Sequence, residues 1–307
     1  MLKFITFFNV IHSSQIKLNN MKSFQYKLLI LLLFMGCTTK SPLSNRYVSK
    51  KKNTQHLVEL GKSHWERRVD LNDAKLSNHF LSKAIELDPK NSEIMALFSR
   101  SCYFIGRFIN NNSESSYSIF MQGYTKSWGH IIASEAFQNS YESASGDSIA
   151  KTIAGLENLS EELLPVAYWW AENYTSYLLT KPVLQRIENR EIIETVIHRI
   201  LSVNPEYNYH GANRIFGSFY AKLPGVNLDQ SKNNFDKSIS SEPAFMTTYI
   251  MRAQYLHTKN GDRDSFIEDL QFVLNTDPTK LPEASPENLF EQEKAKTLLA
   301  KKESLFE

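Results

Sequence analysis

The chain has 307 residues and can bury a core of ordinary size, in one large domain or two. Only 11 glycines and 10 prolines are present, which leaves too little turn chemistry for a many-stranded sandwich or barrel, so we predict an all-α fold. The formal charge of +2 does not describe the body of the chain, because the first 36 residues hold Lys3, Lys17, Lys22 and Lys27 and no acidic residue. Without that segment, 31 of the 35 basic side chains remain against 33 acidic ones. This nearly neutral body gives no electrostatic reason to expect nucleic-acid binding.

An export signal is indicated by residues 21–36. From Met21 the sequence reads MKSFQYKLLILLLFMG, in which two lysines precede an apolar run from Leu28 to Met35 that is short for a permanent membrane-spanning helix. A small residue and then Cys37 follow, which resembles the lipobox of bacterial lipoproteins and implies lipidation of Cys37. Phe34 departs from the leucine usual three positions before the cysteine. The alternatives are an uncleaved anchor or a chance cysteine.

Residues 1–20 precede a better-placed methionine, and we interpret them as an upstream extension produced by a misplaced start. Cys102 is the only other cysteine, so no structural disulfide is expected and Cys102 is interpreted as a small core residue. Residues 37–52 are polar and basic without periodicity, which is typical of a flexible tether.

Residues 53–307 are predicted to form one all-helical domain. The apolar spacing predicts helices over residues 56–68, 76–87, 91–108, 117–137, 147–156 and 162–179, with a polar loop, QNSYESASGD, over residues 138–147. The repeat is not clear between residues 91 and 164, although the helices are.

Residues 204–243 predict a hairpin of two antiparallel helices joined by a Leu-Pro-Gly turn. Ser231, Phe235 and Ser238 precede Pro243 at the spacing that tetratricopeptide repeats use for a small residue, an aromatic residue, a second small residue and a terminating proline.

The same register recurs before three other prolines. The matching triplets are Ser77, Leu81 and Ala84 before Pro89; Ile193, Ile197 and Ile200 before Pro205; and Phe266, Leu270 and Val273 before Pro278. Ile193 and Phe266 stand where a small residue is expected, so the packing must be offset there. We therefore predict an irregular tetratricopeptide-like superhelix of antiparallel helix pairs.

A closing helix is predicted from Ser285, where a capping residue is followed by proline. Its apolar positions include Leu289, Ala295, Leu298 and Leu299, separated by lysine-rich intervals. A solenoid needs such a capping helix because its last unit otherwise leaves an apolar face in water.

The segment ELLPVAYWWAENYTSYLL over residues 162–179 is the most aromatic of the chain. Rings supply contact area, and amide and carboxylate groups supply orientation, so this helix is a candidate lining for a ligand groove. Its candidate ligand-binding residues are Tyr168, Trp169, Glu172, Asn173 and Tyr177. The alternative is a helix buried on two sides, with at least one of the adjacent tryptophan rings in the core.

A second candidate surface surrounds a predicted helix start at Tyr207 and Tyr209. Exposed amides and Arg214 there would receive a carboxylate, with His210 and Asn213 beside them. The alternative is that His210 or Asn213 caps the helix and that Arg214 is solvated.

Arg252 lies within the apolar stretch TTYIMRAQYL and would need a partner if buried. It is either a cation for a ligand or one half of an internal ion pair. Catalytic signatures are absent from the sequence, which has no HExxH, no paired CxxC, no phosphate-binding glycine loop and no GxSxG. We therefore expect no enzyme, no metal site and no cofactor, although a triad from distant positions stays open.

Residues 165–306 resemble the T component of TRAP-type (tripartite ATP-independent periplasmic) transporters, the TatT-like family of tetratricopeptide lipoproteins. The resemblance is carried by VAYWWAENYTSYL, IHRILSVNPEYNYHGANRIFGSFYAKLPG, SKNNFDKSISSEP and LPEASPENLFEQEKAKTLLAKKESLF. It extends more loosely to the lipobox and to Leu60-Gly61. Ser231 and Ser238 stand where the repeat usually has alanine.

The resemblance implies a lipid-anchored protein of the bacterial cell envelope that faces the periplasm, as a homo-oligomer and specifically a trimer with a central channel. It also implies association with an extracytoplasmic solute-binding protein, and ligands that are small organic acids or apolar molecules. Without the resemblance, the residues indicate only a tethered helical body. The alternative function is therefore a general envelope scaffold for protein–protein interaction.

Overall fold

The computed structural model describes residues 42–110 and 113–307. The predicted upstream extension (1–20), the predicted signal (21–36) and the predicted lipidation site Cys37 therefore lie outside the described residues. The chain divides into two units, residues 1–52 and 53–307. The hydrophobic core lies in the second unit.

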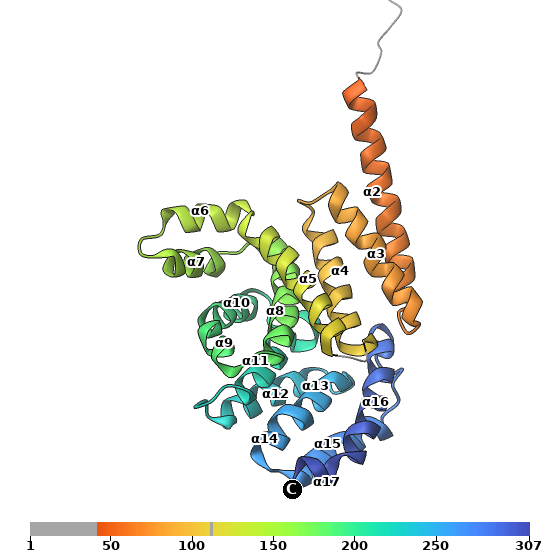
Figure 1. Cartoon of the computed structure of the whole chain (residues 1–307), viewed down its shortest axis with the longest axis vertical. Helices are drawn as coiled ribbons and strands as arrows, with labels where there is room; N and C mark the ends of the chain where they lie inside the picture. The colour runs from red at the N-terminus through yellow and green to blue at the C-terminus, as the bar shows by residue number, and fades with distance from the viewer. Residues whose placement is uncertain (1–41, 111–112) are drawn as a thin grey trace, which may run out of the picture. The chain divides into compact units, whose positions relative to one another are not determined.

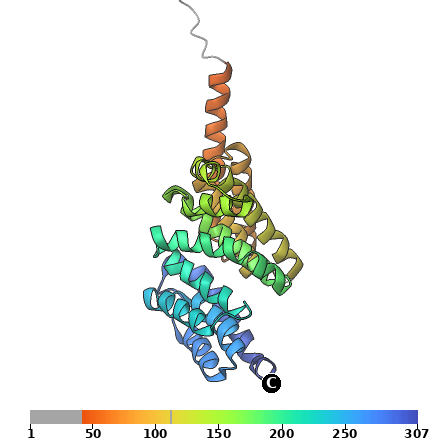
Figure 2. The same ribbon diagram turned by 90° about the vertical axis from the view of Figure 1, so that its left-hand side faces the viewer.

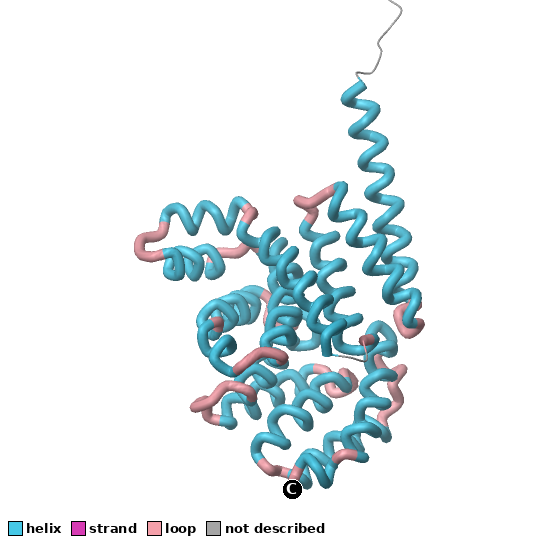
Figure 3. The backbone as a smooth tube through the Cα atoms, viewed as in Figure 1, coloured by secondary structure: helices cyan, strands magenta, loops and turns pink. Residues whose placement is uncertain are grey.

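All regular structure in the described residues is helical (Figures 1 and 3). The α-helices are α2 (Pro42–Glu66), α3 (Leu71–Leu87), α4 (Ser92–Phe104), α5 (Ser113–Ile132), α6 (Glu135–Ser143), α7 (Ser148–Glu157), α8 (Leu164–Leu179), α9 (Val183–Glu188), α10 (Arg190–Val203), α11 (Tyr207–Ala221), α12 (Leu228–Ser241), α13 (Met246–Met251), α14 (Thr258–Asn260), α15 (Arg263–Asn275), α16 (Ser285–Ala300) and α17 (Lys302–Leu305). Two π-helices, η1 (Ile105–Ile109) and η3 (Arg252–His257), and two 3₁₀ turns, η2 (Glu161–Leu163) and η4 (Pro282–Ala284), complete the set. The predicted all-α fold of packed helix pairs is confirmed.

The predicted tether differs from the structure where it is described. Residues 42–52 form the first turns of α2 and are helical. Proline occupies the first helical position, where its missing N–H is harmless, and no glycine or further proline follows before Gly61. No helix in residues 42–110 or 113–307 is long and apolar enough to cross a bilayer.

Two helix pairs of the second unit approach closely through the same device. In the α11/α12 hairpin, Ser231 Oγ donates to the Gly217 carbonyl oxygen at 2.6 Å, and a Cβ atom on Gly217 would lie 2.8 Å from the Phe235 ring. In the α2/α3 pair, Ser77 Oγ donates to the Gly61 carbonyl oxygen at 2.8 Å. A Cβ atom on Gly61 would lie 2.8 Å from the side chain of Leu81, which occupies the same repeat position as Phe235. The repeat register read from the prolines therefore corresponds to a repeated contact.

The helix expected over residues 117–137 ends earlier, at Ile132, and the loop expected over residues 138–147 is largely helix α6. The reason is local: the Ser134 hydroxyl accepts a hydrogen bond from the Phe137 N–H and so caps a new helix. Phe137 then packs, 3% exposed, against Gly155 of α7. The polar composition of α6 reflects its exposed faces.

Helix α16 begins at Ser285 as predicted, but it does more than cap an apolar end. Ala295 and Leu298 pack on the C-terminal core, whereas the buried residues of its first half are Glu287, Asn288 and Glu291. Leu289, expected on the packed face, is 41% exposed. Figure 2 shows α12 to α17, in cyan to blue, gathered below α3 to α8, in orange to green. The polar first half of α16 forms ion pairs with Arg68 and Arg107, which belong to the N-terminal part of this unit.

Phe235→Ala should lower the free energy of unfolding by about 3–5 kcal/mol, because it leaves a cavity at the contact between α11 and α12. Urea titration followed by circular dichroism measures the change. Asn233→Ala, on the exposed face of the same helix, is the control and should shift stability by no more than about 0.5 kcal/mol. Equal effects of the two changes would show that the contact does not hold the hairpin.

Candidate functional site

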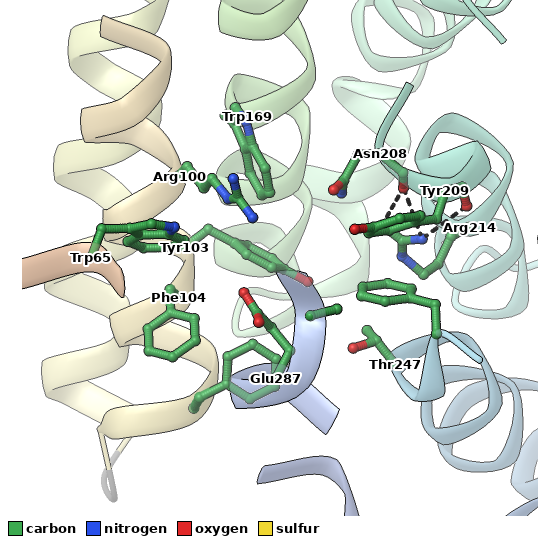
Figure 4. A pocket seen from close by; sticks show the side chains of 13 residues that line it. Trp65, Arg100, Tyr103, Phe104, Trp169, Asn208, Tyr209, Arg214, Thr247 and Glu287 are labelled. Carbon is green, nitrogen blue, oxygen red and sulfur yellow. Dashed lines mark hydrogen bonds between the residues drawn. The ribbon is translucent and has the colours of Figure 1, made fainter. Parts of the chain in front are cut away.

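A small aromatic cavity lies within the second unit (Figure 4). It is enclosed by residues from α2, α4, η1, α8, α11, the segment before and into α13, η4 and α16. Its volume is about 20 Å³, of the order that one or two water molecules occupy. Its walls are Trp65, Arg100, Tyr103, Phe104, Phe108, Trp169, Asn208, Tyr209, Arg214, Phe245, Thr247, Ala284 and Glu287.

Arg214 is fully buried at one side of the cavity. Its Nη2 donates to the Tyr168 hydroxyl at 2.7 Å and lies 3.5 Å from Glu172 Oε1, while the Tyr168 hydroxyl donates to Glu172 Oε1 at 2.5 Å. Burial lowers the pKa of Arg214, but Tyr168 and Glu172 outweigh it, so the pKa is raised overall. The guanidinium is therefore permanently charged and held in a low-dielectric setting, where its electrostatic reach is long.

A left-handed turn at the start of α11 forms the wall beside Arg214. Asn208, Tyr209 and His210 have φ values of 50°, 60° and 52°, and for residues other than glycine this conformation costs roughly 1–2 kcal/mol each. Arg214 donates to the carbonyl oxygens of Asn208 and Tyr209 at 3.4 Å. The turn thus aims two carbonyl dipoles at the arginine.

Neighbouring side chains hold the turn in place. Asn208 Nδ2 donates to the Tyr168 hydroxyl at 2.8 Å, and the Tyr209 ring packs on Phe245 with centroids 4.7 Å apart. A Cβ atom on Gly211 would collide with the Tyr168 ring and hydroxyl, so only glycine permits this approach. The strain is concentrated beside the cavity, where backbone strain in proteins tends to accompany function.

Arg100 enters the cavity from α4 between two tryptophan rings. Its Cζ lies 4.7 Å from the Trp65 ring centroid and 5.5 Å from that of Trp169, within cation–π range. Within the described chain it makes no hydrogen bond or ion pair. Burial lowers its pKa, an effect that the charge of Glu287 opposes. Figure 4 shows its side chain extending into the space between Trp169 and Tyr103.

Three buried polar atoms of the lining have no hydrogen-bond partner within the described residues: the Tyr103 hydroxyl, Thr247 Oγ1 and Arg214 Nε. These side chains are 7%, 2% and 1% exposed. Leaving a buried polar group unpaired costs about 1–3 kcal/mol. Burial, and then the Glu172 charge, raises the pKa of Tyr103, so its hydroxyl keeps its proton. The cavity therefore offers hydrogen-bond donors to an occupant.

Glu287 lines the cavity from α16. Arg68 binds it through two contacts, Nη2 to Oε2 at 2.7 Å and Nε to Oε1 at 3.1 Å. Such a bidentate pair fixes both the position and the plane of the carboxylate. A second pair, Arg107 Nη2 to Glu291 Oε1 at 2.6 Å, lies one helical turn further along α16. The two buried carboxylates of α16 are thus paired with arginines of η1 and of the turn between α2 and α3.

One comparison with known proteins decides the family. Residues 114–306, more than half of the chain, match the family described as the TRAP transporter T-component. The chain belongs to this family. No curated protein matches it. The family resemblance in the sequence is thereby confirmed, and the protein is an accessory component of a TRAP-type transport system.

Four of the residues predicted as ligand contacts in this T component meet at the cavity. Trp169 and Arg214 line it, and Tyr168 and Glu172 support Arg214 from behind. Asn173 is fully buried and donates to the carbonyl oxygens of Ser99 and Trp169. Both tryptophans of α8 are buried together with Tyr168, Glu172 and Asn173, which agrees with the alternative of a helix buried on two sides. The ligand-binding role of these residues stays a prediction.

The other predicted residues lie apart from the cavity lining. Tyr177 packs against Tyr117 with ring centroids 4.8 Å apart, and its hydroxyl lies 3.2 Å from that of Tyr117. Asn213 Nδ2 donates to Asn234 Oδ1 at 2.9 Å. His210 belongs to the left-handed turn rather than to a regular helix start. The alternative that Arg214 is solvated is wrong, because Arg214 is 1% exposed.

Arg252 forms an internal ion pair, which was one of its two interpretations. Its Nη2 contacts Asp269 Oδ1 at 2.6 Å and its Nη1 contacts Asp236 Oδ1 at 2.8 Å. Arg252 thus binds two carboxylates and does not line the cavity. Among the described residues, no group of three or more His, Cys, Asp or Glu side chains is placed to hold a metal ion.

Sequence reasoning missed Arg100, Tyr103, Thr247 and Glu287 as site residues of the T component. A signal was present for Arg100, which stands in the apolar stretch MALFSRSCYF as Arg252 stands in its own. Trp65, Arg100 and Tyr103 precede the residues that match the family. Part of the cavity is therefore built from sequence outside the matched segment.

Arg214→Met should destabilise the protein by about 3–5 kcal/mol, because it leaves Glu172 as a buried, unpaired carboxylate. Adding Glu172→Gln should recover a large part of that loss, which a double-mutant cycle in urea measures. The exposed pair Glu293 and Lys296 is the control, and its cycle should give at most about 1 kcal/mol. Additive effects at Arg214 and Glu172 would mean that the pair is not coupled.

Proposed function

We propose that this chain is a lipid-anchored T component of the bacterial cell envelope that faces the periplasm, engages the extracytoplasmic solute-binding protein of its TRAP system, and passes a small ligand through the aromatic cavity. The family match supports the transport role. The observation that carries ligand passage is the cavity itself, which combines apolar rings with buried donors that have no partner. Small-molecule sites combine apolar rings with a few polar groups in this way but are larger, and a groove of about 660 Å³ that is also lined by Arg100 and Trp169 supplies that room.

A partner surface is supported by the short helix α9, which has no buried residue. Its apolar side chains Val183, Leu184 and Ile187 are 43%, 59% and 45% exposed. Clustered exposed apolar side chains are typical of protein interaction sites. We assign this surface to the solute-binding protein. We also propose that the chain forms a homo-oligomer, which by family resemblance is a trimer.

The docking proposal predicts that Leu184→Asp lowers capture of the solute-binding protein at least ten-fold, because a charge would be buried at the interface. Capture is measured with purified proteins by biolayer interferometry, after pull-down from envelope extracts identifies the partner. Ile149→Asp, at a 54% exposed position of α7, is the control and should leave capture unchanged. Recovery of assembly factors without any solute-binding protein would instead support the alternative of a general envelope scaffold.

The anchor proposal rests on the sequence pattern around Cys37. Metabolic labelling with a fatty-acid analogue should mark the wild-type protein and the Cys102→Ala variant alike, because the Cys102 thiol is fully buried. Cys37→Ala should lose the label and move from the membrane to the soluble fraction. Equal labelling of Cys37→Ala and wild type would contradict the anchor.

A further inference from the structure

Positive charge is concentrated at the N-terminal end of the chain. The first acidic residue is Glu59, and nine of the 35 basic side chains precede it. Residues 59–307 therefore hold the remaining 26 basic side chains against all 33 acidic ones, a net charge of −7. The basic side chains between residues 38 and 58 are Lys40, Arg46, Lys50, Lys51 and Lys52. A charge asymmetry of this kind is typical of a segment that binds an anionic surface.

The part of α2 that carries the lysines is exposed. Residues 47–53 are all exposed, and Thr54 is the first buried residue after them. Tyr47 and Val48, two residues that packing would normally cover, are 70% and 51% exposed. Helices in proteins gain most of their stability from packing one face, and residues 47–53 bury no side chain within the described chain. This stretch of α2 is therefore available to a partner.

Four of these residues share one side of the helix. Tyr47 lies beside Lys51 and Val48 beside Lys52, because residues four apart in a helix lie on the same face. We call these four residues the basic face. Among the described residues, neither Lys51 nor Lys52 forms an ion pair. A ring and a valine beside two lysines combine apolar area with positive charge, which is the composition of helices that lie on a lipid surface.

We infer that the basic face binds the anionic phospholipid head groups of a membrane. Lys51 and Lys52 pair with lipid phosphates, and Tyr47 and Val48 enter the interfacial layer. The net negative charge of residues 59–307 is repelled by the same surface, so electrostatic attraction is confined to the first turns of α2. The inference goes beyond the proposed function, because the contact needs neither an acyl chain nor a transport partner.

The position of the basic face favours lipid over another polyanion. Tyr47 lies ten residues after Cys37, the proposed lipidation site. Attraction between lysines and a charged membrane falls off within a Debye length, about 8 Å at physiological ionic strength, so it requires a segment that is kept close to the head groups. A basic segment beside a lipid anchor meets this condition and supplies a second membrane signal.

Co-sedimentation of residues 38–307 with vesicles tests the inference, because this chain keeps every described residue and has no lipidated cysteine. Vesicles of equal parts phosphatidylglycerol and phosphatidylcholine should bind it at least ten-fold more tightly than vesicles of phosphatidylcholine alone. Raising the salt from about 0.1 M to about 1 M shortens the Debye length from about 10 Å to about 3 Å and should remove most of the binding. Equal binding to both kinds of vesicle, or binding to neither, overturns the inference.

Two double variants locate the contact. Lys51→Glu with Lys52→Glu should weaken binding to the anionic vesicles at least ten-fold, because two attractive charges become repulsive. Lys301→Glu with Lys302→Glu makes the same change in net charge at the other end of the chain and should alter binding by no more than about two-fold. Equal losses in the two double variants would show that overall charge drives binding, and would overturn the inference.

Tyr47→Trp places a fluorescent reporter on the basic face. Its emission should shift to shorter wavelength with anionic vesicles, whereas the wild type, with its four native tryptophans, should show no shift. An unshifted reporter contradicts contact of this face with lipid. Salt-sensitive self-association in sedimentation velocity, without vesicle binding, would assign the lysines to the acidic body of a second copy and overturn the inference. Fatty-acid labelling at Cys37 is measured separately, so failure here leaves the proposed anchor standing.

Discussion

Two buried ion pairs between α16 and the N-terminal half of the body, Arg68 with Glu287 and Arg107 with Glu291, hold the rest of the arrangement. Each joins residues far apart in the sequence, 219 and 184 positions, and each charge would be costly to bury alone. Because both partners are present, the last long helix closes against the first ones. The aromatic cavity exists in the space that this closure encloses.

The two sides of the cavity are maintained by different means. On the α16 side a carboxylate is fixed by a bidentate arginine. At the wall beside α11 an arginine is fixed by a tyrosine, a glutamate and a left-handed turn of three residues that would not adopt this conformation unaided. Close packing of α11 against α12 and of Tyr168 against Gly211 holds the turn. Local strain is thus offset by tertiary contacts, and the result is a rigid, polar-lined void among rings.

The hairpin of residues 204–243 was predictable because its determinants are local: Ser231, Phe235 and Ser238 recur at helical spacing and are all buried. The cavity was not, because Arg100, Thr247 and Glu287 come from elements whose proximity depends on the whole superhelix. The polar face of α16 and the helix α6 were misread for a related reason. Their polar residues face other polar groups or solvent, so composition alone does not distinguish helix from loop or buried from exposed.

The closure by α16 has a consequence for how the protein matures. Helix pairs such as α11 and α12 depend on contacts close in the sequence and can form early, whereas contacts between distant segments form slowly, after a large loss of chain entropy. The cavity requires α16 and is therefore among the last features to be completed during folding. A chain that has formed most of its helices but not yet docked α16 has no assembled cavity, so the cavity marks a fully folded molecule.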